Sequence, residues 1–487
     1  MSDLRWMSAG ELTASIRRGE LSAREALQSH WNRIDALNPT INAVIYEDRD
    51  RAWEDAAAAD ERQASGAALG PLHGVPMTNK DSNATAGMPN TWGSPLLQDV
   101  VPSQDNLAVG RLRAAGAIMT GKSNVPEFAA GAHTFNEVYG TTGNPYDPSR
   151  SAGGSSGGAA AAIAAGIQPV GDGSDMGGSL RIPASFCNVL GLRPSLGRVP
   201  DLHDNSWMWL GRIGPMAREV SDLALMMNVM SGPDPRVPTS IQEADVDFRV
   251  GLRSGVSGLR IGWSPDVGLG VPVDPEVVRV AEHALAVFAD AGAIIEEAAP
   301  DLAEADEVFR QTRAFDMEFG WGELVRGNPS LVKPEMIENV ELGHRQTAAD
   351  LHRLARARTR LETRTREYFG RYDLWLTPTA QVLPFPAAQR WPREVAGEPM
   401  GDYLDWMRSV CVVSAMSTPA LSVPAGFSAT GLPVGIQLVA PQGADALLLR
   451  AAHAYEERTL WSRVHPRLEA SDDPSPLTAY PLTGEHR

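Results

Sequence analysis

The spacing of apolar residues predicts that the N-terminal part of the chain is helical. Residues 8–11 and 22–25 each place a serine three positions before a glutamate, which is the capping-box pattern of a helix start. Residues 23–37 and 46–64 then repeat apolar positions at intervals of three and four, with few helix breakers. We therefore expect helices over most of the first 66 residues.

From residue 72 onwards, short apolar runs alternate with glycine turns and amphipathic stretches. This alternation predicts strands at 117–120, 167–171, 259–262, 373–377, 420–423 and 436–439, and helices at 107–115, 157–165, 221–231, 274–291 and 444–458. Strands that alternate with helices usually form a parallel sheet with helices on both faces. We expect residues 301–371, which are charged and helical in pattern, to form a covering layer.

No repeat or linker divides the chain, so we expect one α/β domain with a central twisted sheet that is mixed but largely parallel. Its expected regions are N-terminal helices (1–70), a glycine-rich core (71–245), a helical covering region (246–370), a closing segment (371–470) and a polar, frayed tail (471–487).

The composition argues against several classes of partner. With 43% hydrophobic and 21% charged residues, the 487-residue chain has an ordinary soluble composition. Its net charge of −17 argues against a nucleic-acid partner, because surfaces that bind nucleic acid are usually basic. No run approaches the roughly 20 apolar residues of a membrane span, and the N-terminus lacks an apolar signal core. We expect a cytoplasmic protein without nucleic-acid or membrane partners, and leave a homodimer open.

The sequence does not indicate a metal site. Cys187 and Cys411 are the only cysteines, which is too few for a four-ligand zinc site and typical of a reducing compartment. The ten histidines show no paired spacing of the kind that metal ligands adopt. We therefore expect no bound metal.

Lysine is rare in this chain. Of 43 basic residues only Lys80, Lys122 and Lys333 are lysines, and a nucleotide bias toward arginine codons is the simplest cause. Lysine can lose its proton and act as a base, whereas arginine effectively cannot. A lysine that persists in such a background is therefore a candidate for a position that arginine cannot serve.

Two glycine-rich turns carry serines, at residues 153–158 and 171–183. Glycine lets consecutive N–H groups point at one spot, as an oxyanion hole requires. The first turn fits G-x-S-x-G through Ser155 or Ser156, the pattern of α/β-hydrolases, but His453 and His465 are poorly placed as the histidine of that mechanism.

Lys80 is the alternative base. A lysine can replace histidine if burial or a neighbouring cation lowers its pKa toward neutrality. The spacing alone leaves open that Lys80 pairs with Asp81 on the surface.

Together these segments resemble the amidase signature family. Ser155 and Ser179 stand 24 residues apart, as in the family, and the resemblance is weakest from about 246 to 370. The other matching segments are 74–81, 121–124, 142–146, 191–194, 214–218, 419–424 and 431–437.

The resemblance implies the amidase signature fold and a Ser–cis-Ser–Lys triad without a cofactor. Ser179 would be the nucleophile, Ser155 a bridging serine after a cis peptide bond, and Lys80 the neutral base. The resemblance also implies an oxyanion hole and a substrate contact, made by the backbones of Met176, Gly177, Gly178, Ser179 and Ala129.

The resemblance leaves the substrate to be inferred. Ile182 stands where the glutamine-hydrolysing component of tRNA-dependent amidotransferases has a glutamine, which argues against that function. We favour a stand-alone serine amidohydrolase of aryl or alkyl amides, because Trp207, Trp209 and Phe128 suggest an apolar pocket that Trp92, Phe315 and Met317 would extend. Esters and carbamates stay open as substrates. The alternatives are a catalytically silent scaffold and that amidotransferase component.

Overall fold

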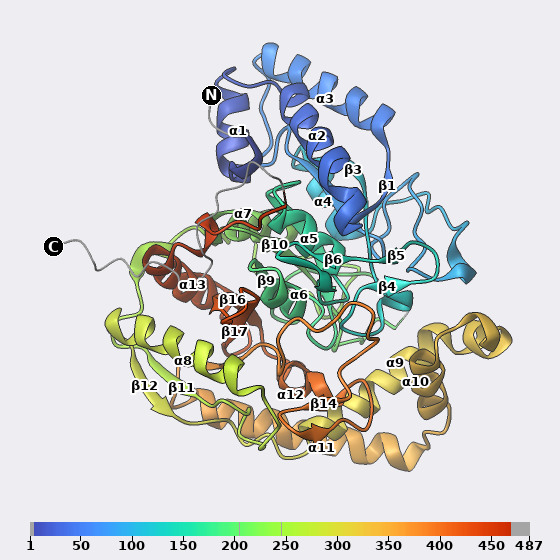
Figure 1. The fold of residues 1–487 in the computed structure, drawn as a ribbon, viewed down its shortest axis with the longest axis vertical. Coiled ribbons are helices and arrows are strands. Elements are labelled where there is room, and N and C mark those ends of the chain that lie inside the picture. Colours follow the sequence, from blue (N-terminus) through green and yellow to red (C-terminus); the bar gives the residue numbers. More distant parts are fainter. Residues whose placement is uncertain (1–3, 204, 245, 469–487) are drawn as a thin grey trace.

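The computed structural model describes residues 4–203, 205–244 and 246–468 and builds them around an eight-stranded sheet (Figure 1). Its strands, in spatial order, are β12 (Ile294–Glu297), β11 (Arg260–Trp263), β13 (Leu374–Pro378), β17 (Pro433–Val439), β16 (Ala420–Phe427), β9 (Leu190–Arg193), β10 (Arg212–Ala217) and β8 (Val170–Asp175). The predicted tail 471–487 lies outside the described residues.

Most helices occur close to where the apolar pattern predicts them. They are α1 (Ala9–Arg17), α2 (Ala23–Ile41), α3 (Arg49–Ala64), α4 (Leu107–Ala114), α5 (Gly157–Ala164), α6 (Arg181–Phe186), α7 (Val220–Met230), α8 (Pro275–Asp290), α9 (Ala305–Gly327), α10 (Pro334–His344), α11 (Ala348–Phe369), α12 (Arg408–Ala415) and α13 (Asp445–Thr459). The apolar pattern does not predict α6 and α12. The capping boxes at Ser8 and Ser22 are both formed. None of the helices in the described ranges is long and apolar enough to cross a membrane.

The sheet is mixed, as predicted, but the expectation that it is largely parallel is wrong. β11 runs parallel to β12 and β13, whereas β17, β16, β9, β10 and β8 are joined by antiparallel pairings. β8 and β9 flank α6 and run in the same direction, but β10 lies between them. The sequence shows that strands and helices alternate, but not that a later strand is inserted into a crossover.

Helices cover both faces of the sheet. In β13, Leu374 and Leu376 belong to one apolar core, while Trp375 between them belongs to another. The first core includes α7, α8 and α13, and the second includes α6 and α12 with α9 and α11 beyond them. This period-two alternation places a separate apolar layer on each side.

The N-terminal helices pack around a second, three-stranded sheet. β3 (Ile118–Ser123) lies between β1 (Val44–Glu47) and β2 (Pro76–Lys80). The predicted helix from residue 46 therefore begins later, because Tyr46 and Glu47 pair with β3. α5 contacts both this sheet and the eight-stranded one, and so joins the two sheets.

Six short strands complete the described part of the structure, and residues 305–369 of the expected covering region form the helices α9, α10 and α11. The short strands are β4 (Phe135–Asn136), β5 (Gly140–Thr141), β6 (Gly143–Asn144), β7 (Asp147–Ser151), β14 (Glu394–Val395) and β15 (Glu398–Pro399). Figure 1 shows α9, α10 and α11 at the opposite end of the molecule from α1–α3. The covering region thus borders the side where α6 and α12 lie.

Asp222 joins α1 to α7. Its buried carboxylate accepts hydrogen bonds from the Ala9 and Gly10 N–H groups at 2.7 and 3.0 Å. Each donor left unpaired in a buried place costs about 1–3 kcal/mol. We therefore expect Asp222→Ala to lower the free energy of unfolding by about 3 kcal/mol in urea denaturation, whereas Ser221→Ala, at the exposed neighbouring position, leaves it unchanged. Equal stability of the two variants would contradict this role.

Candidate active site

Lys80 lies at the end of β2 and is completely buried. Its Nζ donates to Ser155 Oγ at 2.8 Å, to Ser174 Oγ at 2.9 Å and to the Ser174 carbonyl at 3.3 Å. Asp81 is buried elsewhere and accepts hydrogen bonds from Thr91. The structure therefore excludes the surface ion pair of Lys80 with Asp81 and places the lysine against the first serine turn.

Burial favours the neutral form of Lys80. It lowers the lysine pKa to about 7, while the negative charges of Asp175 and Asp172 act in the opposite direction. Asp172 also fixes the lysine backbone, because its Oδ1 accepts the Lys80 N–H at 3.0 Å. Near neutral pH, a substantial fraction of Lys80 can therefore accept a proton from Ser155.

The turn around Ser155 needs its glycines for space. The Gly154–Ser155 peptide bond is cis, as the resemblance implied. A Cβ at Gly153 would lie 2.8 Å from Pro183 Cα, and one at Gly154 would lie 2.9 Å from the His133 backbone nitrogen. Gly153 also has a φ of +76°, which favours glycine. No larger residue fits at these two positions without moving backbone.

The turn that carries Ser179 is held by the carboxylate of Asp175. Asp175 accepts the N–H groups of Gly178 and Leu180 at 2.9 and 3.1 Å. It also pairs with Arg181 at 3.0 Å, and both side chains are fully buried. The Ser156 N–H donates to the Ser179 carbonyl at 3.1 Å, which joins the two serine turns.

This arrangement changes the predicted oxyanion hole. The Gly178 N–H already donates to Asp175, so the structure removes Gly178 from the predicted donors. In the described part of the chain, the N–H groups of Met176, Gly177 and Ser179 have no hydrogen-bond acceptor. These three stay candidates to bind an anionic oxygen.

Ser155, Ser179 and Ala129 line a cavity of about 550 Å³. Its apolar wall includes Trp92, Phe128, Met176, Met208, Met317 and Trp321. The Trp321 ring packs 5.2 Å from that of Trp92 and 5.0 Å from that of Phe128. Serine hydroxyl groups and aromatic rings therefore line the same cavity.

The predicted roles of Trp207 and Trp209 in this cavity are wrong. Trp207 is 71% exposed, and Trp209 is buried with the Arg358 guanidinium 3.8 Å from its ring centre. Met208, between them, lines the cavity. The chain turns here, since the Met208 N–H donates to the Asn205 carbonyl at 3.0 Å, and so the neighbouring tryptophans are directed elsewhere. Phe315 lines a separate groove on α9, not the cavity.

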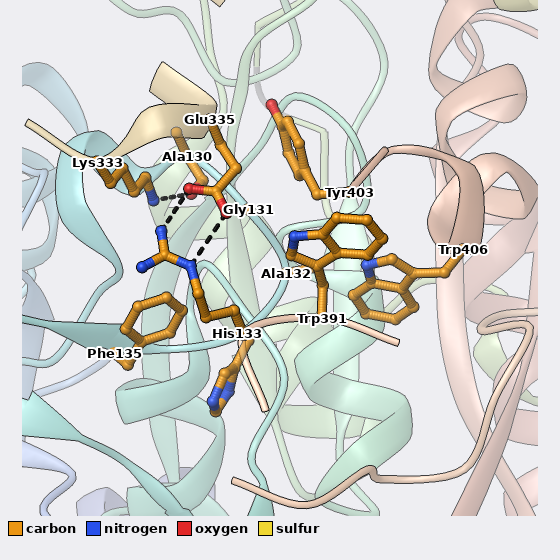
Figure 2. Close-up of a pocket in the computed structure, with 11 residues that line it drawn as sticks. Ala130, Gly131, Ala132, His133, Phe135, Lys333, Glu335, Trp391, Tyr403 and Trp406 are labelled. Carbon is orange, nitrogen blue, oxygen red and sulfur yellow. Dashed lines mark hydrogen bonds and ion pairs between the residues drawn. The ribbon is translucent and has the colours of Figure 1, made fainter. Parts of the chain in front are cut away.

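Lys333 supports the loop that presents Ala129. Phe128 and Ala129 have φ values of 53° and 51°, a left-handed conformation that is uncommon for non-glycine residues. Figure 2 shows Lys333 Nζ bonded to the Ala130 carbonyl behind this loop. The Lys333 N–H also donates to Glu127 Oε2 at 2.9 Å. One residue of the covering region therefore holds both ends of the loop.

The pocket drawn in Figure 2 is small, about 20 Å³. Gly131 borders both spaces. The guanidinium of Arg390 lines this pocket and pairs with Glu335 at 2.5 Å. It is close enough for its charge to act on Lys333, but no hydrogen bond joins it to the loop within the described residues.

All three lysines place the ammonium group against oxygen atoms in low-dielectric surroundings. Lys122 Nζ donates to the Asn83 carbonyl at 2.5 Å and to Thr85 Oγ1 at 3.2 Å. Burial lowers the pKa of Lys122 and of Lys333 to about 8. Among the three, Lys80 is the one in contact with a serine hydroxyl that lines the cavity.

Sequence reasoning did not anticipate which polar residues surround Lys80. Asp172, Ser174 and Asp175 form the polar part of the second glycine turn, and two of them raise the pKa of Lys80. The sequence shows that these three residues are close to one another along the chain. Their contact with Lys80, however, depends on β2 and β8 lying side by side.

Comparison with known proteins shows to which family the chain belongs. The family model described as Amidase matches residues 25–449. The chain belongs to the amidase family. The predicted resemblance is thus confirmed, and the chain is an enzyme that acts on carbon–nitrogen amide bonds.

Individual relatives cover nearly the full length. The chain is 39% identical to an acylamidase of Rhodococcus erythropolis, over 95% of this chain and 98% of that protein. It is 36% identical to a glutamyl-tRNA(Gln) amidotransferase subunit of Chloroflexus aurantiacus, over 96% and 100%. The crystal structure of a bacterial aryl acylamidase superposes with a TM-score of 0.90 at 30% identity, over 95% and 98%.

The pKa of Lys80 predicts the pH dependence of the enzyme. Because only the neutral amine accepts a proton, kcat/KM for an amide should fall about tenfold per pH unit below about pH 7 and level off above it. Asp172→Asn removes a charge that favours the ammonium form, so the acid limb should move to lower pH. A pH–rate profile of both proteins measures this. An acid limb of the pH–rate profile near the ordinary lysine pKa, or one that moves to higher pH in Asp172→Asn, would contradict a role of Lys80 as the base.

The contact of Lys333 with the Ala129 loop predicts a second effect. Lys333→Met keeps the length of the side chain but removes the donor to Ala130, so kcat/KM should fall about tenfold, as for the loss of a charged hydrogen bond. Arg390→Met removes a neighbouring cation that does not touch the loop and should leave kcat/KM within about twofold. Equal losses in the two variants would show that the loop does not depend on Lys333.

Proposed function

We propose that the chain is a stand-alone serine hydrolase of carboxylic amides with aryl or alkyl groups. The contact between Lys80 Nζ and Ser155 Oγ carries this proposal. It places a lysine with a pKa near 7 directly behind Ser155, which lines the same cavity as Ser179. Such a lysine can take the place of the histidine in a serine hydrolase.

The proposed reaction begins with proton transfer through the two serines. Lys80 accepts the proton of Ser155, Ser155 accepts that of Ser179, and Ser179 Oγ forms a bond to the amide carbonyl carbon. The carbon–nitrogen bond then breaks, and the proton returns through Ser155 to the leaving amine. Water adds to the acyl-enzyme by the same route, releases the acid and restores Ser179.

The second glycine turn would stabilise the tetrahedral intermediate. Its oxygen would accept hydrogen bonds from the available N–H groups of Met176, Gly177 and Ser179. Loss of one such donor typically costs about 3–4 kcal/mol of transition-state stabilisation. A Cβ at Gly177 would lie 2.5 Å from Phe309 Cζ, so this turn is also packed tightly against α9.

The preference for apolar substrates rests on the cavity lining. Trp92, Phe128 and Trp321 form an aromatic wall beside the serines. A cavity of about 550 Å³ is of the size that takes small organic ligands, and the aromatic wall would contact their apolar groups. The acylamidase and aryl acylamidase relatives support the same class, and esters or carbamates of similar shape would use the same acyl-enzyme.

A second function follows from a different set of relatives. The similarity to a glutamyl-tRNA(Gln) amidotransferase subunit favours a glutamine-hydrolysing component that works within a complex. Ile182 and the net charge of −17 argue against it. The two functions differ in one measurable property, since a stand-alone enzyme hydrolyses simple amides without partner proteins.

Ser179 should be the nucleophile. We expect a fluorophosphonate probe to label Ser179, as shown by peptide mass, and Ser179→Ala to lose both labelling and at least about 10³-fold of anilide hydrolysis. Ser155→Ala should lose activity in the same way, because the contact with Lys80 is removed.

Ser156→Ala is the matched control, because Ser156 lies in the same turn but makes only a 3.4 Å contact with the Ser174 carbonyl. Near-normal activity of Ser179→Ala would contradict the mechanism. Purified chain that hydrolyses glutamine but no anilide would favour the amidotransferase alternative.

A further inference from the structure

One face of α9 forms a wall of the cavity. Arg313, Asp316, Met317 and Gly320 recur at intervals of three and four residues, and all four line it. Phe309, one turn before Arg313, packs on Gly177. The face therefore leads from the turn that carries the nucleophile toward the far part of the cavity.

Asp316 is the unusual residue on this face. Its side chain is buried, with 6% exposure, yet it lines the cavity. Within the described ranges, no group forms a hydrogen bond with Asp316 Oδ2. Buried carboxylate oxygens are normally paired, because an unpaired one loses its hydration without compensation.

The charged neighbours of Asp316 are engaged elsewhere. Arg313 donates through Nε and Nη2 to Tyr403 Oη at 3.0 and 2.9 Å, and its Nη1 contacts Met176 Sδ at 3.1 Å. His203 pairs with Asp201 at 3.0 Å on the opposite loop. Burial raises the pKa of Asp316 to about 7, although the charges of His203 and Arg313 act to lower it.

We propose that Asp316 accepts a hydrogen bond from an N–H or O–H group on the substrate, at the end remote from the amide that is cleaved. The preferred substrates are then amides that carry a hydroxyl or ammonium group beyond an apolar body. This inference rests on the proposed amide hydrolysis, and it gives one of the charged residues that line the cavity a role in substrate specificity.

The helix geometry gives the length of such a substrate. Phe309 contacts Gly177, and Asp316 follows about seven residues later. At about 1.5 Å per residue, the donor should lie roughly 10 Å from the cleaved carbonyl. Met317 and Trp321 on the same helix, with Phe128 opposite, would contact the apolar body between the two ends.

The test compares paired substrates in the wild type and two variants. The first probe series varies the acyl side and consists of 4-nitroanilides of straight-chain acids of six to ten carbons that end in a methyl, hydroxyl or ammonium group. The second series varies the amine side and consists of N-acetyl anilides that carry the same groups at the end of a para alkyl chain. The measured quantity is the ratio of kcat/KM for a substituted probe to that for its methyl partner. Because both probes use the same triad, effects on Lys80 and Ser179 cancel in this ratio.

We expect the wild type to prefer a hydroxyl or ammonium probe of one length by about 10- to 100-fold, the range of a hydrogen bond to a charged group. Asp316→Leu should abolish this preference while the methyl probe is still hydrolysed. Asp316→Asn, which keeps the size but not the charge, should reduce the preference for ammonium more than that for hydroxyl.

Glu323→Gln is the control, because it removes a charge from the exposed side of the same helix. It should leave all ratios unchanged. A preference that is absent in the wild type in both probe series, or that survives in Asp316→Leu, would overturn the inference. Failure of the wild type to hydrolyse any probe would instead overturn the proposed function.

Discussion

A single buried carboxylate, that of Asp175, sets both the shape and the charge of the site. It binds the Gly178 N–H and pairs with Arg181, and so fixes the turn that carries Ser179. Although burial disfavours its charged form, the adjacent Arg181 guanidinium holds the pKa of Asp175 below its usual range. The resulting negative charge limits how far burial lowers the pKa of Lys80. The position of Ser179 and the pKa of Lys80 therefore depend on the same group.

The remaining features of the site come from segments that are distant in sequence. β2 supplies Lys80, the turn before α5 supplies Ser155, and the turn after β8 supplies Ser179. α9 adds the wall with Asp316, and the segment before α10 holds the Ala129 loop through Lys333. The core thus carries Lys80, Ser155 and Ser179, while the helical covering region contributes part of the cavity wall and the contact with the Ala129 loop. Such a division allows one reaction to be applied to different amides.

Sequence reasoning anticipated much of this structure, because its signals are local. Helix starts at Ser8 and Ser22 follow from capping chemistry, and nearly every predicted helix and strand lies within a few residues of its observed position. Sequence reasoning failed for strand directions and side-chain directions, because these depend on how several distant segments pack together. The strand directions depend on β10, which is inserted between two earlier strands. Trp207 and Trp209 suggested a pocket, but the direction of each side chain depends on the loop's path over the core.

By itself, the sequence determined the chemical groups of the site. It singled out Lys80 among three lysines, two serines in glycine turns, and the glycines that those turns require. Only the tertiary structure decided that Lys80 is buried against Ser155, that the Gly178 N–H is already bound to Asp175, and that Asp316 faces the cavity. The reason is physical: residue type fixes which proton or hydrogen bond a group can exchange, whereas burial and neighbouring charge fix whether it does so.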